Sequence, residues 1–423
     1  MAEPLVRDVD VLVIGAGPAG IAAACAAAEA GRRVSVIDDN PAAGGQIWRH
    51  GPGAAGGDAQ RWLDRFARCG AELQPATAVI DVRSGAGLPA TIRTRSPAAV
   101  TAWRPRSLIL ATGARERQLP FPGWTLPGVV GAGGLQALVK QGLDVRGRRI
   151  VIAGSGPLLL AVADLLVARG ARVPVVAEQA TLGRLAVFAG TLLAHPSKIV
   201  QAIAIRRAIG PVLRAGTVPV AVRASAGRLV VSLASGPPGR QRHRETACDL
   251  LACGFGLVPN VDVAGAIGCH VDRAGIAIDE LGRTTVPGVW AAGECVGVGG
   301  VDKSLVEGRV AGLAAAGQGA EAVRLLPAAR RWRRFARGLE RTFRLDRRLA
   351  RLAADDTIVC RCEDVAFGRL LGHGCWREAK LMTRIGMGPC QGRVCGPIVE
   401  TLFGWEAGDG RPPLSEVPLA DLA

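Results

Sequence analysis

Residues 11–20 read Val-Leu-Val-Ile-Gly-Ala-Gly-Pro-Ala-Gly, an apolar run that passes into the spacing G-x-G-x-x-G. The apolar run predicts a buried strand, and the alanine-rich stretch after it predicts a helix. Between them, Gly15 permits a tight turn, Gly17 lets the backbone approach a pyrophosphate, and Gly20 allows close packing of helix on strand. The free N–H groups at the helix N-terminus attract the anion. This stretch therefore predicts an α/β fold that binds a dinucleotide.

An acidic residue stands where such a fold binds ribose. The next predicted strand, residues 33–37, ends at Asp38, with Asp39 directly after it. A carboxylate at this position can accept hydrogen bonds from both ribose hydroxyls of an adenosine. The order of strand, turn, helix, strand and acid favours a nucleotide site over a purely structural glycine turn. NAD and FAD share the pattern, so it leaves the choice of dinucleotide open.

Three further segments favour FAD at this site. Gly44-Gly45-Gln46 is similar to the segment after the acidic strand in flavin reductases of the thioredoxin-reductase type, and residues 111–114, Ala-Thr-Gly-Ala, resemble a strand end of that superfamily. Residues 287–294 resemble its second FAD motif, with Glu294 in place of the usual aspartate at the ribityl chain. A helix opening at Gly300–Val301 would point its N-terminus at the flavin pyrimidine ring and stabilise reduced flavin. The predicted FAD-contacting set is Gly15, Ala16, Gly17, Pro18, Ala19, Gly20, Asp38, Asp39, Gly45, Gln46, Val79, Ala111, Thr112, Gly113, Gly293, Glu294 and Val301.

Disulfide reductases place a redox cysteine pair beside the flavin. Neither residues 44–48 nor residues 131–135 contain a cysteine, which argues against disulfide reduction.

A second glycine turn begins at Gly154 and reads Gly-Ser-Gly-Pro-Leu-Leu. It keeps Gly154 and Gly156 but has Leu159 at the third glycine position, where we expect it to push the helix from its strand and disturb the phosphate turn. Glu178 ends the next predicted strand and would favour NADH over NADPH, because it repels a 2′-phosphate. NADH binding and a retained scaffold without nucleotide both remain open.

Four cysteines near the C-terminus form a C-x-C pair and a C-x4-C pair. They are Cys360, Cys362, Cys390 and Cys395, and four thiolates are the ligand set of a [2Fe–2S] cluster. Interleaved glycines would let backbone N–H groups approach the cluster, and Arg361 and Arg393 would raise its potential. A structural zinc site is the main rival, although C-x-C is a tight spacing for zinc.

The remaining cysteines carry no predicted site. Cys375 is interpreted as a bystander, and Cys25 and Cys69 as packing residues. Cys248 and Cys253 flank residues 249–252, which we expect to form one buried strand that holds the two sulfurs apart and so excludes a disulfide.

The formal net charge is +16, and arginine supplies nearly all of the positive charge. A dense basic run at 324–351 contains Trp332, Phe335, Leu339 and Phe343 at helical spacing, which indicates an amphipathic helix with a basic, solvated or partner-facing side. Without a nucleic-acid module, nucleic-acid binding is disfavoured. No apolar run reaches the roughly 20 residues that span a bilayer, so we expect a cytoplasmic protein, with peripheral association at the inner membrane as an option.

These elements predict a fold with two Rossmann-like, thioredoxin-reductase-type units, one inserted in the other. We expect a discontinuous FAD domain at 1–117 and 256–320, a second NAD-binding-like domain at 118–255, a basic helical linker at 321–352, and a small [2Fe–2S] domain at 353–423.

Residues 108–129, residues 286–309 and the two cysteine segments resemble the FAD-containing α subunit of heteromeric, dye-linked amino-acid dehydrogenases. That family includes opine oxidase, D-hydroxyproline dehydrogenase and hydrogen cyanide synthase. The C-terminal segment is similar to the bacterioferritin-associated ferredoxin type of [2Fe–2S] domain. The resemblance implies that the chain is an electron-transfer subunit. It also implies a partner flavoprotein of the D-amino-acid-oxidase type that oxidises the small-molecule substrate, and a small ferredoxin-like third subunit.

The remaining residues agree with this division of labour. No His–acid pair stands beside the inferred flavin, His195 is interpreted as structural, and Arg49 or Arg115 could anchor a substrate carboxylate. Two alternatives stay open: a stand-alone NADH-dependent flavin reductase with iron–sulfur output, and a C-terminal zinc module that mediates interactions.

Overall fold

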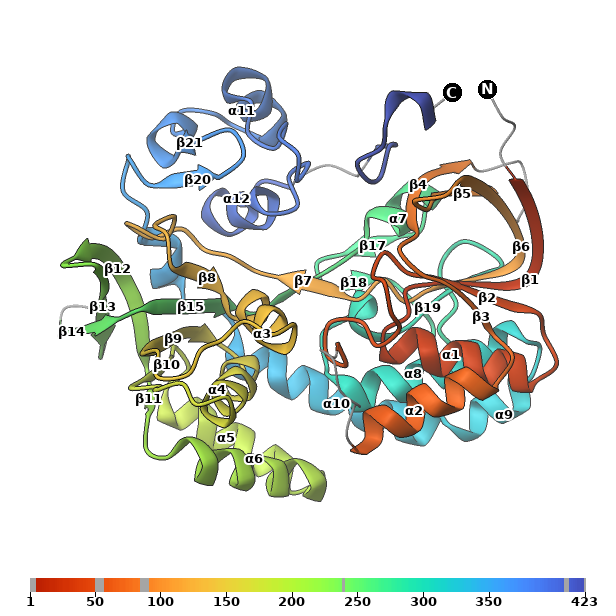
Figure 1. Cartoon of the computed structure of the whole chain (residues 1–423), viewed down its shortest axis with the longest axis horizontal. Coiled ribbons are helices and arrows are strands. Elements are labelled where there is room, and N and C mark those ends of the chain that lie inside the picture. Colours follow the sequence, from red (N-terminus) through yellow and green to blue (C-terminus); the bar gives the residue numbers. More distant parts are fainter. Residues whose placement is uncertain (1–4, 50–56, 84–90, 238–239, 407–410, 422–423) are drawn as a thin grey trace. The chain divides into compact units, whose positions relative to one another are not determined.

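The computed structural model describes residues 5–49, 57–83, 91–237, 240–406 and 411–421 (Figure 1). The chain divides into two compact units, each assembled from separate stretches of sequence. The first unit comprises residues 1–115, 258–337 and 409–423, and the second comprises residues 116–257 and 338–408. The predicted α/β class with one unit inserted in another is confirmed.

The first unit is built on a mixed seven-stranded sheet. Its order is β3-β2-β1-β6-β5-β4, with β19 also paired to β6. The apolar run at 11–14 forms the buried end of β1, which pairs in parallel with β2 and β6. The strands are β1 (Leu5–Ile14), β2 (Val34–Ile37), β3 (Glu72–Gln74), β4 (Ala78–Arg83), β5 (Thr91–Arg95), β6 (Val100–Leu110) and β19 (Val289–Ala291), with the small pair β17 (Val271–Asp272) and β18 (Gly275–Ile276).

Helices α1, α2 and α8 pack beside one another and cover one face of this sheet (Figure 1). Glycine lets α8 approach α1 very closely: a Cβ atom at Gly308 would lie 2.2 Å from the carbonyl oxygen of Ala19, and one at Gly312 would lie 2.3 Å from that of Ala23. The helices are α1 (Pro18–Glu29), α2 (Gly57–Arg68), α7 (Asp262–Ile267), α8 (Val301–Ala315), α9 (Gly319–Arg324), α10 (Leu326–Phe343) and the 3-10 turns η1 (Gly293–Val296) and η4 (Leu419–Asp421).

The second unit contains a parallel sheet of order β11-β10-β9-β15-β8, and the antiparallel sheet β12-β13-β14 packs against it. Helices α3 and α4 pack together beside β15 and β9. The elements are β8 (Val129–Gly131), α3 (Ala132–Lys140), β9 (Ile150–Ser155), α4 (Leu158–Ala168), β10 (Val176–Glu178), α5 (Leu182–Leu192), α6 (Pro196–Ile209), β11 (Leu213–Ala215), β12 (Thr217–Ser225), β13 (Arg228–Ser235), β14 (Arg242–Cys248) and β15 (Leu250–Phe255). The short strands β7 (Ala114–Glu116) and β16 (Leu257–Pro259) pair with each other as a separate two-stranded sheet.

The cysteine-bearing segment belongs to this second unit. Its buried side chains, such as Val359, Ile398 and Val399, share one apolar cluster with the β12–β14 sheet, whereas the sequence predicted a separate domain from residue 353. Its elements are η2 (Arg347–Arg351), β20 (Ile358–Cys360), β21 (Val365–Ala366), η3 (Phe367–Leu370), α11 (Trp376–Thr383) and α12 (Cys395–Phe403).

Two predicted elements differ from the structure. The strand expected across residues 249–253 forms as β15 (Leu250–Phe255), but the chain turns at Asp249, so Cys248 ends β14 and lies on a different strand from Cys253. Both remain free, buried thiols. The basic helix expected over 321–352 is interrupted at Leu325 and ends at Phe343.

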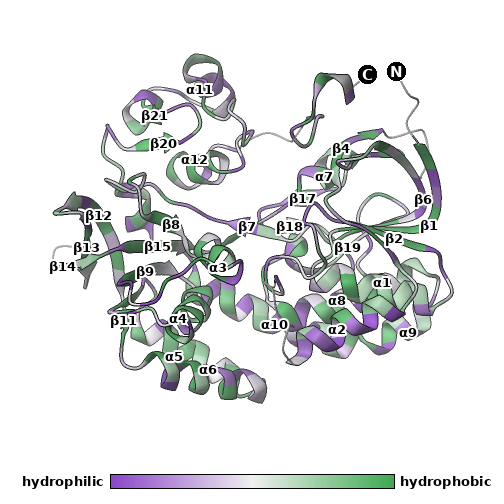
Figure 2. Ribbon diagram, viewed as in Figure 1, coloured by the Kyte–Doolittle hydropathy of each residue, from purple (hydrophilic) through white to green (hydrophobic). Residues whose placement is uncertain are grey.

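Hydropathy follows this architecture. Helices α2 and α10 carry both hydrophilic and hydrophobic residues (Figure 2), as expected for helices with one face on the core. Among the helices of the described residues, none combines the length and apolarity of a membrane-spanning segment.

Candidate functional site

The first glycine turn has the backbone geometry that its sequence requires. Gly15 has φ +106, and a Cβ atom on it would lie 2.3 Å from the carbonyl oxygen of Ala111. A Cβ atom on Gly20 would lie 1.8 Å from the carbonyl oxygen of Gly15. Neither position therefore accepts a side chain. Helix α1 begins at Pro18 with its N-terminal N–H groups at the turn.

Gly17 lies in a cradle that a side chain would fill. It is partly exposed, and the nearest described atom to a Cβ atom on it is the Cα of Gly45, at 4.0 Å. Gly45 has φ +59, and a Cβ atom there would lie only 2.9 Å from the Cα of Gly17. The neighbouring Gly44 donates from its N–H to the carbonyl oxygen of Ala16, at 2.8 Å. Two side-chain-free backbones facing each other at a helix N-terminus fit a pyrophosphate.

The Asp38 side chain is buried at the end of β2. Its carboxylate accepts from the N–H of Ala16 at 2.5 Å and from the N–H of Asn40 at 2.8 Å. Burial and the adjacent Asp38 charge raise the pKa of Asp39. The acid thus braces the glycine turn at the place where a ribose is expected.

The other predicted residues of this site occupy several elements. Gln46 is exposed in the loop after Gly45, and Val79 lies on β4 with its carbonyl oxygen accepting from Ser415 Oγ at 3.1 Å. Thr112 exchanges hydrogen bonds with Asn260, its Oγ1 donating at 2.6 Å and its carbonyl oxygen accepting at 2.9 Å.

Arg49 and Arg115, the two arginines considered as anchors for a substrate carboxylate, both have hydrogen-bond partners within the protein. Arg115 donates to Asn260 Oδ1 at 2.9 Å, and Arg49 donates to Asn40 Oδ1. Both guanidinium groups are therefore held by asparagine amides within the first unit.

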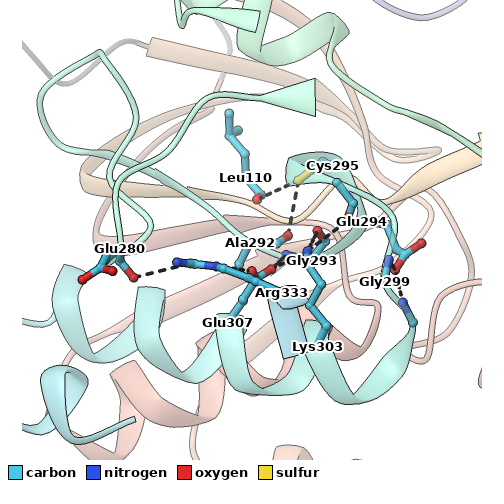
Figure 3. Close-up of polar contacts among 12 residues, drawn as sticks. Leu110, Glu280, Ala292, Gly293, Glu294, Cys295, Gly299, Lys303, Glu307 and Arg333 are labelled. Carbon is cyan, nitrogen blue, oxygen red and sulfur yellow. Dashed lines mark hydrogen bonds and ion pairs between the residues drawn. The ribbon is translucent and has the colours of Figure 1, made fainter. Parts of the chain in front are cut away.

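Glu294 points at the start of α8 (Figure 3). Its Oε1 atom accepts from the N–H groups of Gly299 at 3.0 Å and Gly300 at 2.7 Å. Helix α8 begins at Val301, as predicted. The glutamate side chain, longer than the usual aspartate, thus reaches the loop before α8. Its hydrogen bonds connect the acid to the N-terminus of the helix.

Next to this loop lies a charged trio that the sequence reasoning missed, formed by the buried Lys303 and Glu307 and the partly exposed Arg333 (Figure 3). Lys303 Nζ donates to the carbonyl oxygens of Gly293 at 3.0 Å and Gly297 at 2.8 Å, and to Glu307 Oε2 at 2.7 Å. Arg333 Nε donates to Glu307 Oε1 at 2.9 Å. The available signal was the i,i+4 Lys–Glu spacing, which usually marks a solvated helix face.

The second glycine turn is arranged differently. Glu178 accepts from the N–H groups of Gly156 and Ala180, both at 2.8 Å, and burial raises its pKa to about 7. Leu159 does not disrupt the turn as expected. It is buried, and its Cδ2 atom lies 3.5 Å from the place of a Cβ atom on Gly254 of β15, so a glycine on the neighbouring strand accommodates the leucine.

The four predicted cluster ligands lie together in the second unit. The Cys395 thiol contacts those of Cys360 and Cys390, and the Cys390 thiol also contacts that of Cys362. Hydrogen bonding with Cys395 lowers the pKa of Cys360 to about 6 and that of Cys390 to about 4. Across the described chain, no group of three or more His, Cys, Asp or Glu side chains is arranged to hold a single metal ion.

Glycines shape the loops around these thiols. A Cβ atom on Gly388 would lie 2.3 Å from Cys362 Cβ, and one on Gly386 would lie 2.5 Å from the ring of Trp376. Backbone N–H groups, including that of Gly386, donate to the Cys360 sulfur. Cys375 is exposed at the start of α11. Four thiols with backbone donors fit the donor set of an iron–sulfur cluster.

The guanidinium of Arg361 lies over the Trp124 ring, 5.0 Å from the centroid, and Trp124 Nε1 donates to the carbonyl oxygen of Ile358 at 2.7 Å. His195 is buried at the N-terminus of α6, which agrees with a structural role.

Comparison with known proteins shows which family the chain belongs to. The profile of the pyridine nucleotide-disulphide oxidoreductase family matches residues 9–320. The chain belongs to this family. It is 34% identical to one of the opine oxidase subunits of Rhizobium meliloti, over 98% of each chain, and 31% identical to hydrogen cyanide synthase subunit HcnB of Pseudomonas protegens, over 91% of this chain and 89% of that one.

A solved structure, the L-proline dehydrogenase from P. horikoshii, shares the fold. Its TM-score is 0.67 at 19% identity, with 100% of this chain and 81% of that chain covered. The family and the fitted first turn identify the chain as an FAD-dependent oxidoreductase.

Proposed function

We propose that this chain is the FAD- and [2Fe–2S]-containing electron-transfer subunit of a heteromeric amino-acid or imino-acid dehydrogenase. The relatives named as subunits of opine oxidase and hydrogen cyanide synthase support assembly with other chains. We infer a flavoprotein partner of the D-amino-acid-oxidase type and a small ferredoxin-like subunit. Within this assembly the substrate would be oxidised on the partner, and this chain would relay the electrons.

The chain's residues would hold the two cofactors as follows. Gly17, Gly45 and the N-terminus of α1 would bind the pyrophosphate of FAD, and Asp38 its adenosine ribose. Glu294 and the start of α8 would face the ribityl and pyrimidine end. FAD can take up electrons in pairs and release them singly. The thiols of Cys360, Cys362, Cys390 and Cys395 would hold the acceptor cluster, with backbone N–H groups stabilising negative charge on sulfur.

The observation that carries the iron–sulfur part is the mutual contact of the four thiols from two cysteine pairs that are distant in sequence. A zinc module would use the same sulfurs, so the metal itself must be measured. Purified under anaerobic conditions, the chain should contain FAD, and about two iron atoms and two acid-labile sulfides per molecule. Stoichiometric zinc without iron would reject the relay.

A matched pair of variants separates ligand from bystander. Cys390→Ser removes a proposed ligand and should abolish the visible absorbance of the cluster while leaving FAD content unchanged. Cys375→Ser changes an exposed thiol between the two pairs, so it should leave both cofactors in place. Iron loss in both variants, or in neither, would contradict the assignment.

A further inference from the structure

The two glycine turns of this chain differ in exposure although their sequences are alike. In the first, Gly15, Gly17 and Pro18 are partly exposed and Ala16 is buried. In the second, Gly154, Ser155 and Gly156 are buried and Pro157 is exposed. A dinucleotide turn must be reachable by its ligand, and at Ser155 the second turn is covered by another part of the chain.

That part of the chain is residues 341–346, which we call the connector. Ser155 Oγ donates to the carbonyl oxygen of Phe343 at 3.0 Å. Gln179 Nε2 donates to the carbonyl oxygens of Phe343 at 3.2 Å and Arg344 at 3.0 Å, and also to Ser155 Oγ at 2.8 Å. The N–H of Asp346 donates to Gln179 Oε1 at 2.8 Å. The buried side-chain amide of Gln179 thus bonds to the connector through both its nitrogen and its oxygen.

A third side chain extends these contacts. Arg184, in the first turn of α5, donates from Nη2 to the carbonyl oxygens of Arg341 at 2.9 Å and Arg344 at 3.0 Å. The last carbonyl groups of a helix have no partner within the helix and must find one elsewhere. Ser155, Gln179 and Arg184 therefore close the C-terminal end of α10.

The contacts fall where the adenosine half of a dinucleotide lies in this fold. Ser155 is the last residue of β9, directly before the turn, and Gln179 directly follows Glu178, the acid at the end of β10. The connector is held from both sides of that position.

One N–H group of the second turn also has an internal acceptor. The N–H of Gly156 donates to Glu178 Oε2 at 2.8 Å. A phosphate group at this turn would have to displace that carboxyl group or lie beside it.

We propose that the second dinucleotide turn is a socket for the chain's own connector and takes no nicotinamide nucleotide. The socket would hold the end of α10 and the segment that leads into the cysteine loops. Its consequence for electron flow rests on the proposed function: electrons would reach the FAD from a partner chain and not from NADH. This would remove the stand-alone NADH-dependent reductase as an alternative.

The nucleotide part is tested on the FAD-loaded chain by equilibrium binding of NADH and NADPH up to about 1 mM, the upper end of ordinary KM values. We expect no saturable binding and no reduction of FAD by NADH. Saturable NADH binding that changes hydrogen exchange in residues 154–180 or in the connector would overturn the proposal. NADH binding that leaves hydrogen exchange unchanged in both segments would mean that NADH binds elsewhere and that the socket stays filled, which supports the proposal.

The socket part is tested by hydrogen exchange of variants. Gln179→Ala removes its hydrogen bonds to the connector, so amides of residues 341–351 should exchange about tenfold faster or more. Gln60→Ala is the matched control, because Gln60 bonds to Asp64 on the exposed surface of α2 and should change nothing there. If Gln179→Ala does not fold, Ser155→Ala removes a single donor. Unchanged exchange of the connector in the folded variant would refute the socket.

These outcomes are independent of the cofactor assignment. Iron and FAD are counted on the same preparations, so a chain that lacks the cluster can still show a filled socket, and a chain with both cofactors can still bind NADH.

Discussion

Replacing Lys303 by methionine should loosen the loop between β19 and α8. Lys303 has a side chain 4% exposed, and all three of its N–H donors have acceptors: the carbonyl oxygens of Gly293 and Gly297 and the Glu307 carboxylate. Methionine keeps much of the volume and removes all three hydrogen bonds. Glu307 would keep Arg333 as its remaining charged partner.

The magnitude follows from burial. Removing one member of a buried ion pair costs about 3–5 kcal/mol, and we place Lys303→Met at about 3 kcal/mol because Arg333 still neutralises Glu307. For a unit of roughly 150–250 residues this corresponds to a fall in Tm of about 6–12 °C. The loop that carries Glu294 would lose its two hydrogen bonds from Lys303, which should also weaken FAD binding about tenfold.

The assays are urea unfolding of the apoprotein and FAD titration by flavin fluorescence. Arg330→Met is the control, since the Arg330–Glu280 pair is more than half exposed and should contribute little to stability. The double variant Lys303→Met with Glu307→Gln should lose less than the sum of the single variants, because the two side chains are coupled. A loss below about 1 kcal/mol together with unchanged FAD affinity would refute the role given to this trio.

Three other changes probe the sites separately. Gly17→Ala should leave the Tm of the apoprotein unchanged, because the φ of -75 at Gly17 suits any residue and a Cβ atom there would lie 4.0 Å from its nearest neighbour. The same variant should weaken FAD binding at least tenfold. Gly20→Ala should prevent folding, because its Cβ atom would lie 1.8 Å from the carbonyl oxygen of Gly15. Burial raises the pKa of Glu178 to about 7, so the folded state keeps a proton that the unfolded state releases. Stability should therefore fall by roughly 2–3 kcal/mol as pH rises from about 4.5 to about 7, and urea unfolding of Glu178→Gln should show a flatter profile. Gly388→Ala should displace Cys362 and lower the iron content, measured against an unchanged FAD content.

The first turn could be predicted from sequence because its requirements are local. Gly15 needs a positive φ and Gly20 needs clearance from the preceding backbone, so the residue types themselves reveal the geometry. The same holds for the start of α8 at Val301, which follows directly on Gly300, whose φ of +86 favours glycine. The spacing of the four cysteines also allowed them to be predicted as one site. Two closely spaced pairs on loops form a familiar ligand pattern that can be recognised without knowing the fold.

The contacts that sequence reasoning missed are those made at long range. Gln179 reaches Arg344, 165 positions further along the chain, and no local pattern marks a glutamine as a helix cap for a distant segment. The turn at Asp249 was missed because the apolar residues on either side of it fit one strand equally well. The i,i+4 spacing of Lys303 and Glu307 could be seen in the sequence. Their burial could not, because it depends on carbonyl groups of a loop whose conformation the sequence pattern does not predict.

Within one molecule, the two turns show why a motif alone does not establish a ligand. Both place glycines after a parallel strand and an acid after the next one, and both acids bond to an N–H of their own turn. They differ in what lies beside the turn: Gly45 leaves a gap over Gly17, whereas Gln179 holds the carbonyl groups of the connector beside Ser155. In the second turn the hydroxyl of Ser155 is already bonded to this connector. The family name refers to a pyridine nucleotide, but under our proposal the dinucleotide of this chain is FAD, bound at the first turn.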